Sequence, residues 1–369
     1  MDEQPSDKIL RLAAGRWEAI YSHLASVELG AAMEKAPRHV ACPIHGSSGS
    51  NDGFRMFRDW RENGGGVCNT CGAFHDGIGL MAWLKGMTYK DTLKLLLEEL
   101  EGEGGGAIPP PAPRREADIE RERKARAEED RQSANRIRSV WQSSLPLDHP
   151  RAEPARLYFA RRGLKPYLDP RVLRFHPGLH YLDGDKMLGT FPALVFRVSD
   201  GQGRSVTLHR IYLDCEGNKA PVPKVKKLMG YPRGARTLTG GAIRLAPAGR
   251  LLGIAEGPET ALAIMEATGM PVWSAISTSL MRQVQLPDHV EKVVVWLDKD
   301  ANEAGRIAGQ TLCERMWAEG RYTGAVLPGL PLAHGQSSVD WLDVWNRLGY
   351  AGYPQCYVDP ASDYRRRAM

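Results

Sequence analysis

The sequence has little that would place it in a membrane. No run approaches eighteen consecutive apolar residues, and the first thirty residues lack the basic, apolar and small-residue order of a signal peptide. It also has no Gly-x-x-x-x-Gly-Lys-Ser/Thr phosphate loop, which excludes a nucleotide-driven motor within this chain. We therefore expect a cytoplasmic protein with no membrane partner.

Cysteine is scarce and unevenly placed. Of six cysteines, Cys42, Cys68 and Cys71 cluster, which in a cytoplasmic protein favours metal over disulfide. The knuckles Cys42-Pro-Ile-His45 and Cys68-Asn-Thr-Cys71 each supply two ligands, and a short strand-rich segment between them would bring them together. This spacing predicts a structural Zn²⁺ site with three thiolates and one imidazole. His75 lies close enough to compete as a ligand, but we interpret it as an exposed polar residue.

The overall composition is ordinary for a soluble protein of two or three domains. The chain has 369 residues, of which 42% are hydrophobic and 25% charged. Its net charge of +5 is compatible with nucleic-acid binding without being diagnostic of it.

Helical periodicity recurs in the first half of the chain. It predicts helices over 8–33, 87–100 and 155–163, and the run 101–113, rich in glycine and proline, has no means of packing and predicts a linker. Residues 114–140 carry mixed charges and few large apolar side chains, which indicates a solvated helix. A basic tether following nucleic acid is the alternative, but the interspersed glutamates disfavour it.

A hairpin and a basic segment come next. Residues 191–197 and 206–214 have the pattern of strands, and 200–203 has the composition of the turn between them. Three lysines, Lys224, Lys226 and Lys227, follow in a stretch rich in proline and glycine, which predicts a loop. Such a loop either solubilises the surface or binds phosphate.

Two acidic segments carry the chemistry of the second half. Apolar runs end at Glu256-Gly-Pro-Glu259 and at Asp298-Lys-Asp300, and each is followed by a helical pattern. The carboxyl ends of strands in an open α/β sheet form the ligand-binding edge. Three carboxylates gathered there would repel one another unless a cation such as Mg²⁺ lay between them. The alternative is that Asp-Lys-Asp is only a turn or a helix cap.

The chain beyond these segments completes an α/β pattern. We expect a helix over 303–318, a strand over 323–327 and a further helix entered by Asp340 and Asp343, where capping alone would account for Asp340. Residues 363–369 form a basic tail.

The order Glu-Gly-x-x, about forty residues, then Asp-x-Asp resembles the Toprim domain of bacterial primases, topoisomerases and some nucleases. The Cys/His knuckles, followed by Asp76-Gly-Ile-Gly, resemble the zinc ribbon of bacterial and mobile-element (phage or plasmid) primases. The resemblance implies an α/β fold, with a Toprim (Rossmann-like) catalytic core, a preceding basic α+β subdomain and an N-terminal zinc-ribbon β module. The expected parts are the ribbon domain 1–101, linker and charged helix 102–140, basic subdomain 141–249, Toprim subdomain 250–349 and tail 350–369.

The same resemblance implies roles for individual residues. Glu256, Asp298 and Asp300 would hold catalytic Mg²⁺ or Mn²⁺, with Glu259 and Asp340 as outer-shell or second-metal ligands. Contacts to nucleotide and template are expected from the basic residues Arg210, Lys224, Lys226 and Lys227, and on the ribbon from Arg55, Arg58 and Arg61. Among the ribbon aromatics, Phe54 or Phe57 is expected in the core rather than on a base-stacking surface.

The function implied is that of a DNA primase. Its partners would be a single-stranded DNA template, ribonucleoside triphosphates and a helicase that must be a separate protein. A Toprim nuclease would use the same carboxylates, and a zinc-dependent accessory that only binds single strands is the non-enzymatic alternative. A topoisomerase would need a catalytic tyrosine in a further large domain, for which there is little room.

Overall fold

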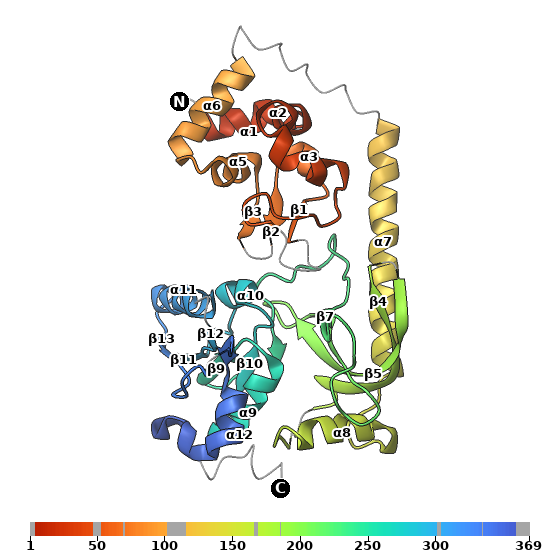
Figure 1. Cartoon of the computed structure of the whole chain (residues 1–369), viewed down its shortest axis with the longest axis vertical. Helices are drawn as coiled ribbons and strands as arrows, with labels where there is room; N and C mark the ends of the chain where they lie inside the picture. The colour runs from red at the N-terminus through yellow and green to blue at the C-terminus, as the bar shows by residue number, and fades with distance from the viewer. Residues whose placement is uncertain are drawn as a thin grey trace. The chain divides into compact units, whose positions relative to one another are not determined.

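The computed structural model describes residues 4–46, 53–68, 71–101, 116–165, 169–184, 186–300, 304–333 and 335–358. It divides into two compact units, Met1–Glu120 and Arg121–Met369, each of which is described by itself (Figure 1). The linker predicted over 101–113, apart from its first residue, and the basic tail lie outside the described residues.

The N-terminal unit begins with three short helices where the sequence predicted one. They are α1 Pro5–Ala13, α2 Trp17–Leu24 and α3 Ser26–Glu34. The first break contains Gly15, whose φ of 74° is left-handed, and the second lies at Ala25, whose φ is −148°. Ile9, Trp17 and Ile20 of the predicted apolar stripe are buried, so the periodicity identified the core but not the breaks.

A small antiparallel sheet completes this unit with three more helices. Phe54 is fully buried in its core, as expected for one of the ribbon aromatics. The predicted helix over 87–100 is confirmed by α6, which Thr88 introduces by accepting a hydrogen bond from the Asp91 N–H at 3.2 Å. The elements are β1 Phe54–Met56, α4 Trp60–Asn63, β2 Gly66–Cys68, β3 Gly72–Phe74, α5 Gly77–Lys85 and α6 Tyr89–Glu101.

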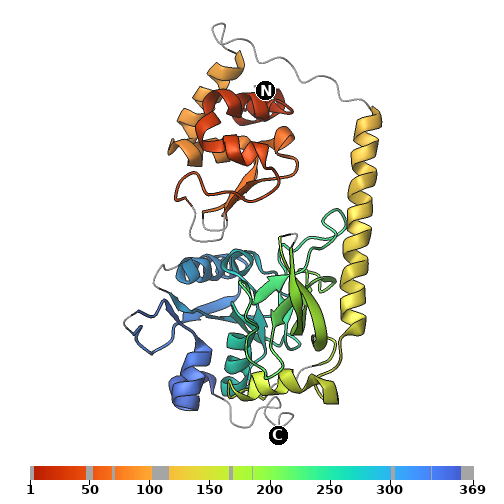
Figure 2. The same cartoon turned by 45° about the vertical axis from the view of Figure 1, so that its right-hand side comes forward.

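The second unit opens with the long charged helix and an antiparallel sheet. The solvated helix predicted over 114–140 is confirmed as α7, Glu116–Ser143, which lies beside β4 in both views (Figures 1 and 2). The predicted hairpin is confirmed by β5 and β6. The elements are η1 Pro150–Ala152, α8 Glu153–Ala160, β4 Leu173–Asp183, β5 Lys186–Ser199, β6 Ser205–Tyr212 and β7 Lys226–Leu228, with sheet order β4-β5-β6-β7.

The structure differs from the sequence-based predictions at two places in this sheet. The lysine-rich segment predicted as a loop contains β7, because Arg210 and its neighbours on β6 supply backbone partners to Lys226–Leu228. Strand β4 was not predicted, since its run is interrupted by His176, Pro177 and Gly178, where the pairing with β5 shifts register.

A five-stranded sheet in the order β13-β11-β9-β10-β8 forms the remainder, parallel except for β8. Helices α9 and α12 cover one face and α11 the other (Figure 1). The bounds are β8 Ile243–Arg244, β9 Leu251–Ala255, α9 Pro258–Thr268, β10 Val272–Ser274, α10 Thr278–Gln283, β11 Lys292–Trp296, α11 Ala304–Ala318, β13 Tyr322–Val326 and α12 Trp341–Leu348. The predicted helix over 303–318 and strand over 323–327 correspond to α11 and β13.

Short elements close the chain. A two-stranded ribbon pairs β12, Lys299–Asp300, with β14, Ser338–Val339, so that Asp300 lies opposite Ser338. The 3₁₀ turns η2 Gly349–Gly352 and η3 Gln355–Tyr357 follow α12. None of the helices in the described residues is both long and apolar enough to cross a membrane.

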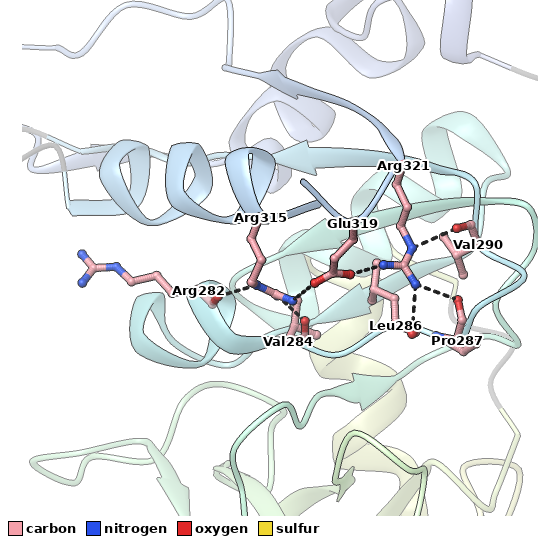
Figure 3. Close-up of polar contacts among 8 residues, drawn as sticks. All are labelled: Arg282, Val284, Leu286, Pro287, Val290, Arg315, Glu319 and Arg321. Carbon is pink, nitrogen blue, oxygen red and sulfur yellow. Dashed lines mark hydrogen bonds and ion pairs between the residues drawn. The ribbon is translucent and has the colours of Figure 1, made fainter. Parts of the chain in front are cut away.

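An arginine network fixes the turn between α11 and β13 (Figure 3). Arg315 and Arg321 both bind the carboxylate of Glu319, which lies between them. Their remaining N–H groups donate to the backbone carbonyls of Arg282, Val284, Leu286, Pro287 and Val290. Because these donors satisfy carbonyls at the end of α10 and in the segment that follows it, the end of α11 and the start of β13 are held in one position.

Candidate functional site

The two acidic segments meet at one edge of the parallel sheet. Strand β9 ends at Ala255 directly before Glu256, and β11 ends at Trp296, two residues before Asp298. Ala255 and Trp296 are paired neighbours in the register, so both carboxylates emerge from the same end of adjacent strands. This is the arrangement that the sequence predicted.

The carboxylates at this sheet edge are not balanced by enough positive charge to keep their pKa values at the usual level. The Oδ1 atom of Asp298 is buried and has no hydrogen-bond partner. Burial raises the pKa of Asp298 to about 8, and the charges of Asp340, Glu256 and Asp300 add to the increase. Burial and the charge of Asp300 likewise raise the pKa of Glu256 to about 7. Both acids would bind a cation in preference to remaining charged alone.

The donor set fits a hard divalent ion. Carboxylate oxygens are the ligands of Mg²⁺ and Mn²⁺, and an orphaned buried oxygen on Asp298 is an available one. Gly305 makes room at the second aspartate, because a Cβ there would lie 3.1 Å from Oδ2 of Asp300. Among the described residues, however, no three of these carboxylates bring their oxygens within 4.8 Å of one another.

The backbone of Glu256 is held by a strained neighbour. The Glu256 carbonyl accepts hydrogen bonds from the hydroxyl of Ser274 at 2.7 Å and from the N–H of Ile276 at 2.8 Å. Ile276 has a φ of 72°, in the left-handed region that a β-branched residue rarely adopts. Neither contact was predicted from the sequence, and an isoleucine carries no signal for positive φ.

Asp340 and Asp343 form the cap of α12. The Oδ1 atom of Asp340 accepts from the Asp343 N–H at 2.9 Å, and Oδ2 of Asp343 accepts from the Asp340 N–H at 3.2 Å. This reciprocal capping box accounts for Asp343, while Asp340 also raises the pKa of Asp298 and so lies near the carboxylate cluster.

Glu259 is engaged with two partners from the preceding subdomain. Its Oε1 accepts from the hydroxyl of Tyr158 at 2.8 Å, and its Oε2 pairs with Nζ of Lys226 at 2.9 Å. Burial opposes ionisation of Glu259, but the charge of Lys226 and the two hydrogen bonds outweigh it and hold its pKa below the usual value. Tyr158 was not predicted to take part, since a tyrosine on a short helix gives no sign of its partner.

This contact predicts a coupled loss of stability. Replacing Lys226 with methionine leaves the Glu259 carboxylate buried without its cation, and we expect a cost of about 2 kcal/mol, reduced from a fully buried pair because Lys226 is partly exposed. In a Glu259→Gln background the same replacement should cost far less. Urea unfolding of the four proteins measures this coupling, and equal costs in both backgrounds would contradict it.

The other predicted basic residues differ in their exposure and in the hydrogen bonds they already form. Arg210 donates to the hydroxyl of Tyr212 at 2.9 Å and to the carbonyl of Leu228 at 3.0 Å, and Lys227 donates to the carbonyl of Leu182. Lys224 is exposed. The predicted basic residues therefore lie on and beside β7, and two of them, Arg210 and Lys227, form hydrogen bonds within the sheet.

On the zinc ribbon the three arginines are also unequal. Arg61 makes a bidentate pair with Glu18, at 2.6 and 2.9 Å, and Arg55 lies 5.9 Å from the ring centroid of Phe57. Arg58 is exposed. Arg61 is thus engaged on its own unit, while Arg55 is only partly exposed.

The predicted zinc ligands come together. One ligand atom each from Cys42, His45, Cys68 and Cys71 lies within 4.8 Å of the others, and His45 Nε2 is 3.2 Å from the sulfur of Cys68. Burial, with the neighbouring thiols, raises the pKa of Cys71 to about 12, so a cation is needed to make this sulfur a thiolate. Three sulfurs and one imidazole fit a closed tetrahedral Zn²⁺ site. His75 is exposed and stacks on Phe57 outside this group, as expected.

Three segments of the chain match known domain families. Residues 251–351 match the Toprim domain, residues 37–78 match the zinc-binding domain of primase-helicase, and residues 131–239 match a domain of unknown function, DUF7146. No curated protein matches the sequence.

Solved structures of primases are similar over much of the chain at low identity. The zinc-binding and RNA polymerase domains of the Aquifex aeolicus primase are 15% identical, with 95% of this chain and 83% of that chain covered and a TM-score of 0.40. The primase fragment of the bacteriophage T7 primase-helicase is 16% identical, with 85% and 95% covered and a TM-score of 0.31. A primase domain from Pseudomonas aeruginosa is 14% identical, with 58% and 74% covered and a TM-score of 0.39.

The family matches and the carboxylate edge define a Toprim-domain protein. The zinc-binding domain at its N-terminal side makes the assignment more particular. The chain thus contains a Toprim domain and, before it, a zinc-binding domain of the primase-helicase type, as the resemblance in the sequence indicated.

Proposed function

We propose that this protein is a DNA primase that makes short RNA primers on single-stranded DNA by metal-dependent nucleotidyl transfer. The observation that carries the proposal is the cluster of Glu256, Asp298 and Asp300 with its buried, unpartnered oxygen. A zinc ribbon of the primase-helicase type in the same chain favours template-directed synthesis over other uses of that cluster.

The carboxylates would hold the divalent ions, and Asp340 would contribute from the cap of α12. When bound, Mg²⁺ or Mn²⁺ would activate a 3′-hydroxyl and neutralise charge at the α-phosphate of the incoming ribonucleoside triphosphate. No side-chain nucleophile is required. Lys226 holds Glu259 ionised beside this edge, and exposed Lys224 would contribute positive charge for phosphates.

Template contact is assigned to two surfaces. Arg55 and Arg58 on the ribbon would contact the phosphates of single-stranded DNA. Arg210 and Lys227 keep positive charge on the sheet that precedes the Toprim domain, although their N–H groups already bind backbone and tyrosine oxygens. A separate helicase would expose the single strand, because this chain has no phosphate loop.

A priming assay tests the proposal directly. The full chain is incubated with a panel of short single-stranded templates, labelled ribonucleoside triphosphates and Mg²⁺ or Mn²⁺. We expect labelled oligoribonucleotides that depend on the template and the metal. If no template gives product with either metal, the primase assignment fails. Shortened templates would indicate the nuclease, and binding without either reaction would indicate the accessory protein.

A further inference from the structure

The outer edge of the Toprim sheet is open and uncharged. Strand β13 is the last in the order, and its only strand partner among the described residues is β11. Its sequence, Tyr322-Thr-Gly-Ala-Val326, contains no charged residue or proline, and Tyr322, Gly324 and Ala325 are exposed. Sheet edges are normally protected by charge, proline or a bulge, so this one resembles a pairing surface.

Backbone groups point outward from β13 at alternate residues. Tyr322 N–H donates to the carbonyl of Glu291, and the carbonyl of Val326 accepts from Leu297 N–H, so residues 322, 324 and 326 face β11. Thr323 and Ala325 therefore present their N–H and C=O groups to the open side. An antiparallel strand centred on Gly324 would satisfy both residues.

A hollow lies above this edge, under one stripe of α11. It has a volume of about 340 Å³, and from the strand side Thr323, Ala325 and Leu327 line it. From the helix Arg306, Gln310 and Cys313 line it, which are spaced as one face of a helix. The hydroxyl oxygen of Thr323 is buried without a hydrogen-bond partner.

The same helical stripe continues to an exposed tryptophan. Trp317 follows Cys313 by four residues and is 68% exposed, as is Tyr322 at the start of β13. The network of Arg315, Glu319 and Arg321 holds the turn between these two aromatic residues (Figure 3). Both are therefore presented in a fixed geometry, which lowers the entropic cost of binding.

We propose that two copies of this chain associate through the outer edge of β13, and that Trp317 of each copy enters the hollow of the other. A two-fold axis at Gly324 makes the strands antiparallel, which pairs Thr323 with Ala325 of the second copy. A Cβ built at Gly324 meets nothing within 4 Å, so the axis position is open. The two sheets then form one continuous sheet.

Charge and direction favour a second copy over an unrelated strand. Helix α11 carries Arg306 near its start and Glu314 and Arg315 nearer its end, and Arg315 is already paired with Glu319, so an antiparallel copy brings Glu314 toward Arg306. The same arrangement places Trp317 of one copy over the Arg306 end of the hollow in the other. Arg306 would then lie beside an aromatic ring.

Sedimentation equilibrium of the full chain at micromolar concentrations tests the proposal. We expect a reversible dimer in the wild type. Trp317→Glu should weaken it about thirtyfold or more, and Tyr322→Lys should weaken it as well. Both side chains are exposed in the single chain, so neither change should alter folding, which circular dichroism checks.

Met187→Glu is the matched control, because Met187 is 57% exposed on β5, away from this edge. It should leave the dimer intact. A chain that stays monomeric at high micromolar concentration overturns the proposal. So does a dimer whose dissociation constant is unchanged by Trp317→Glu and Tyr322→Lys, since a different surface would then join the copies.

Discussion

Replacing Asp298 with asparagine is expected to remove primer synthesis, with a loss of roughly 10³-fold or more in rate. Asn keeps the size of the side chain but loses the charge that a divalent ion requires. The effect should be large because Oδ1 of Asp298 has no other partner and is therefore free to bind a metal ion. Rates of labelled primer formation in Mg²⁺ and Mn²⁺ measure it, and Asp300→Asn is expected to behave in the same way.

Asp288→Asn provides the control, because Asp288 is an exposed aspartate outside the cluster. It should retain the wild-type rate. Single-strand binding should persist in Asp298→Asn, which separates loss of catalysis from loss of template. Undiminished synthesis by Asp298→Asn and Asp300→Asn would exclude the carboxylate cluster as the active site.

In the absence of metal, the free energy of unfolding should depend on pH through Asp298. Folding raises the pKa of Asp298 from 3.8 to about 8, so the folded chain retains a proton that the unfolded chain releases. The free energy of unfolding therefore falls as pH rises from about 4 to about 8 without metal, and Asp298→Asn should show a smaller fall, because only the contribution of Glu256, whose pKa is raised to about 7, is then left of the two. Mg²⁺ should stabilise the wild type at pH 8 and the variant much less, as thermal unfolding would show.

Replacing Cys68 with serine is expected to unfold the zinc-ribbon part of the N-terminal unit. A structural zinc site contributes on the order of 10 kcal/mol to folding, which exceeds what a small sheet of three short strands supplies. Cys68 is buried within the ligand group, so the loss of one thiolate also leaves a polar hydroxyl in the core. Zinc content by mass spectrometry and limited proteolysis of the full chain measure the result.

Cys215→Ser is the matched control for this change. Cys215 is exposed and lies outside the ligand group, so zinc content and protease resistance should equal those of the wild type. A chelator should reproduce the Cys68→Ser pattern, with new cleavages confined to the unit that ends at Glu120. Full zinc content in Cys68→Ser would show that the ion lies elsewhere.

The sequence predicted most clearly the parts where residue type determines structure directly. Cysteine and histidine spacing located the zinc ligands, and apolar runs ending in carboxylates located Glu256 and Asp298 at one sheet edge. In both cases the signal lies within a few consecutive residues. Local chemistry was therefore enough.

What escaped prediction depends on residues distant in the chain. Tyr158 meets Glu259 across 101 positions, and the strand pairing of Lys226 requires Ile211 of β6. Ile276 adopts positive φ because its N–H must reach the carbonyl of Glu256, a demand set by the fold and invisible in the residue type. Tertiary contacts decided each of these.

The ion pair between Lys226 and Glu259 also limits how the protein can be divided. Its buried acid belongs to the segment that matches the Toprim domain, whereas its cation and Tyr158 precede residue 251. One hydrophobic core contains Phe175 and Phe196 together with Ala255 and Ile264, so the same boundary cuts through packed side chains. A fragment starting at residue 251 would expose this core and would leave the buried carboxylate of Glu259 without its partners. The smallest autonomous piece carrying the carboxylates should therefore start with α7 rather than with β9.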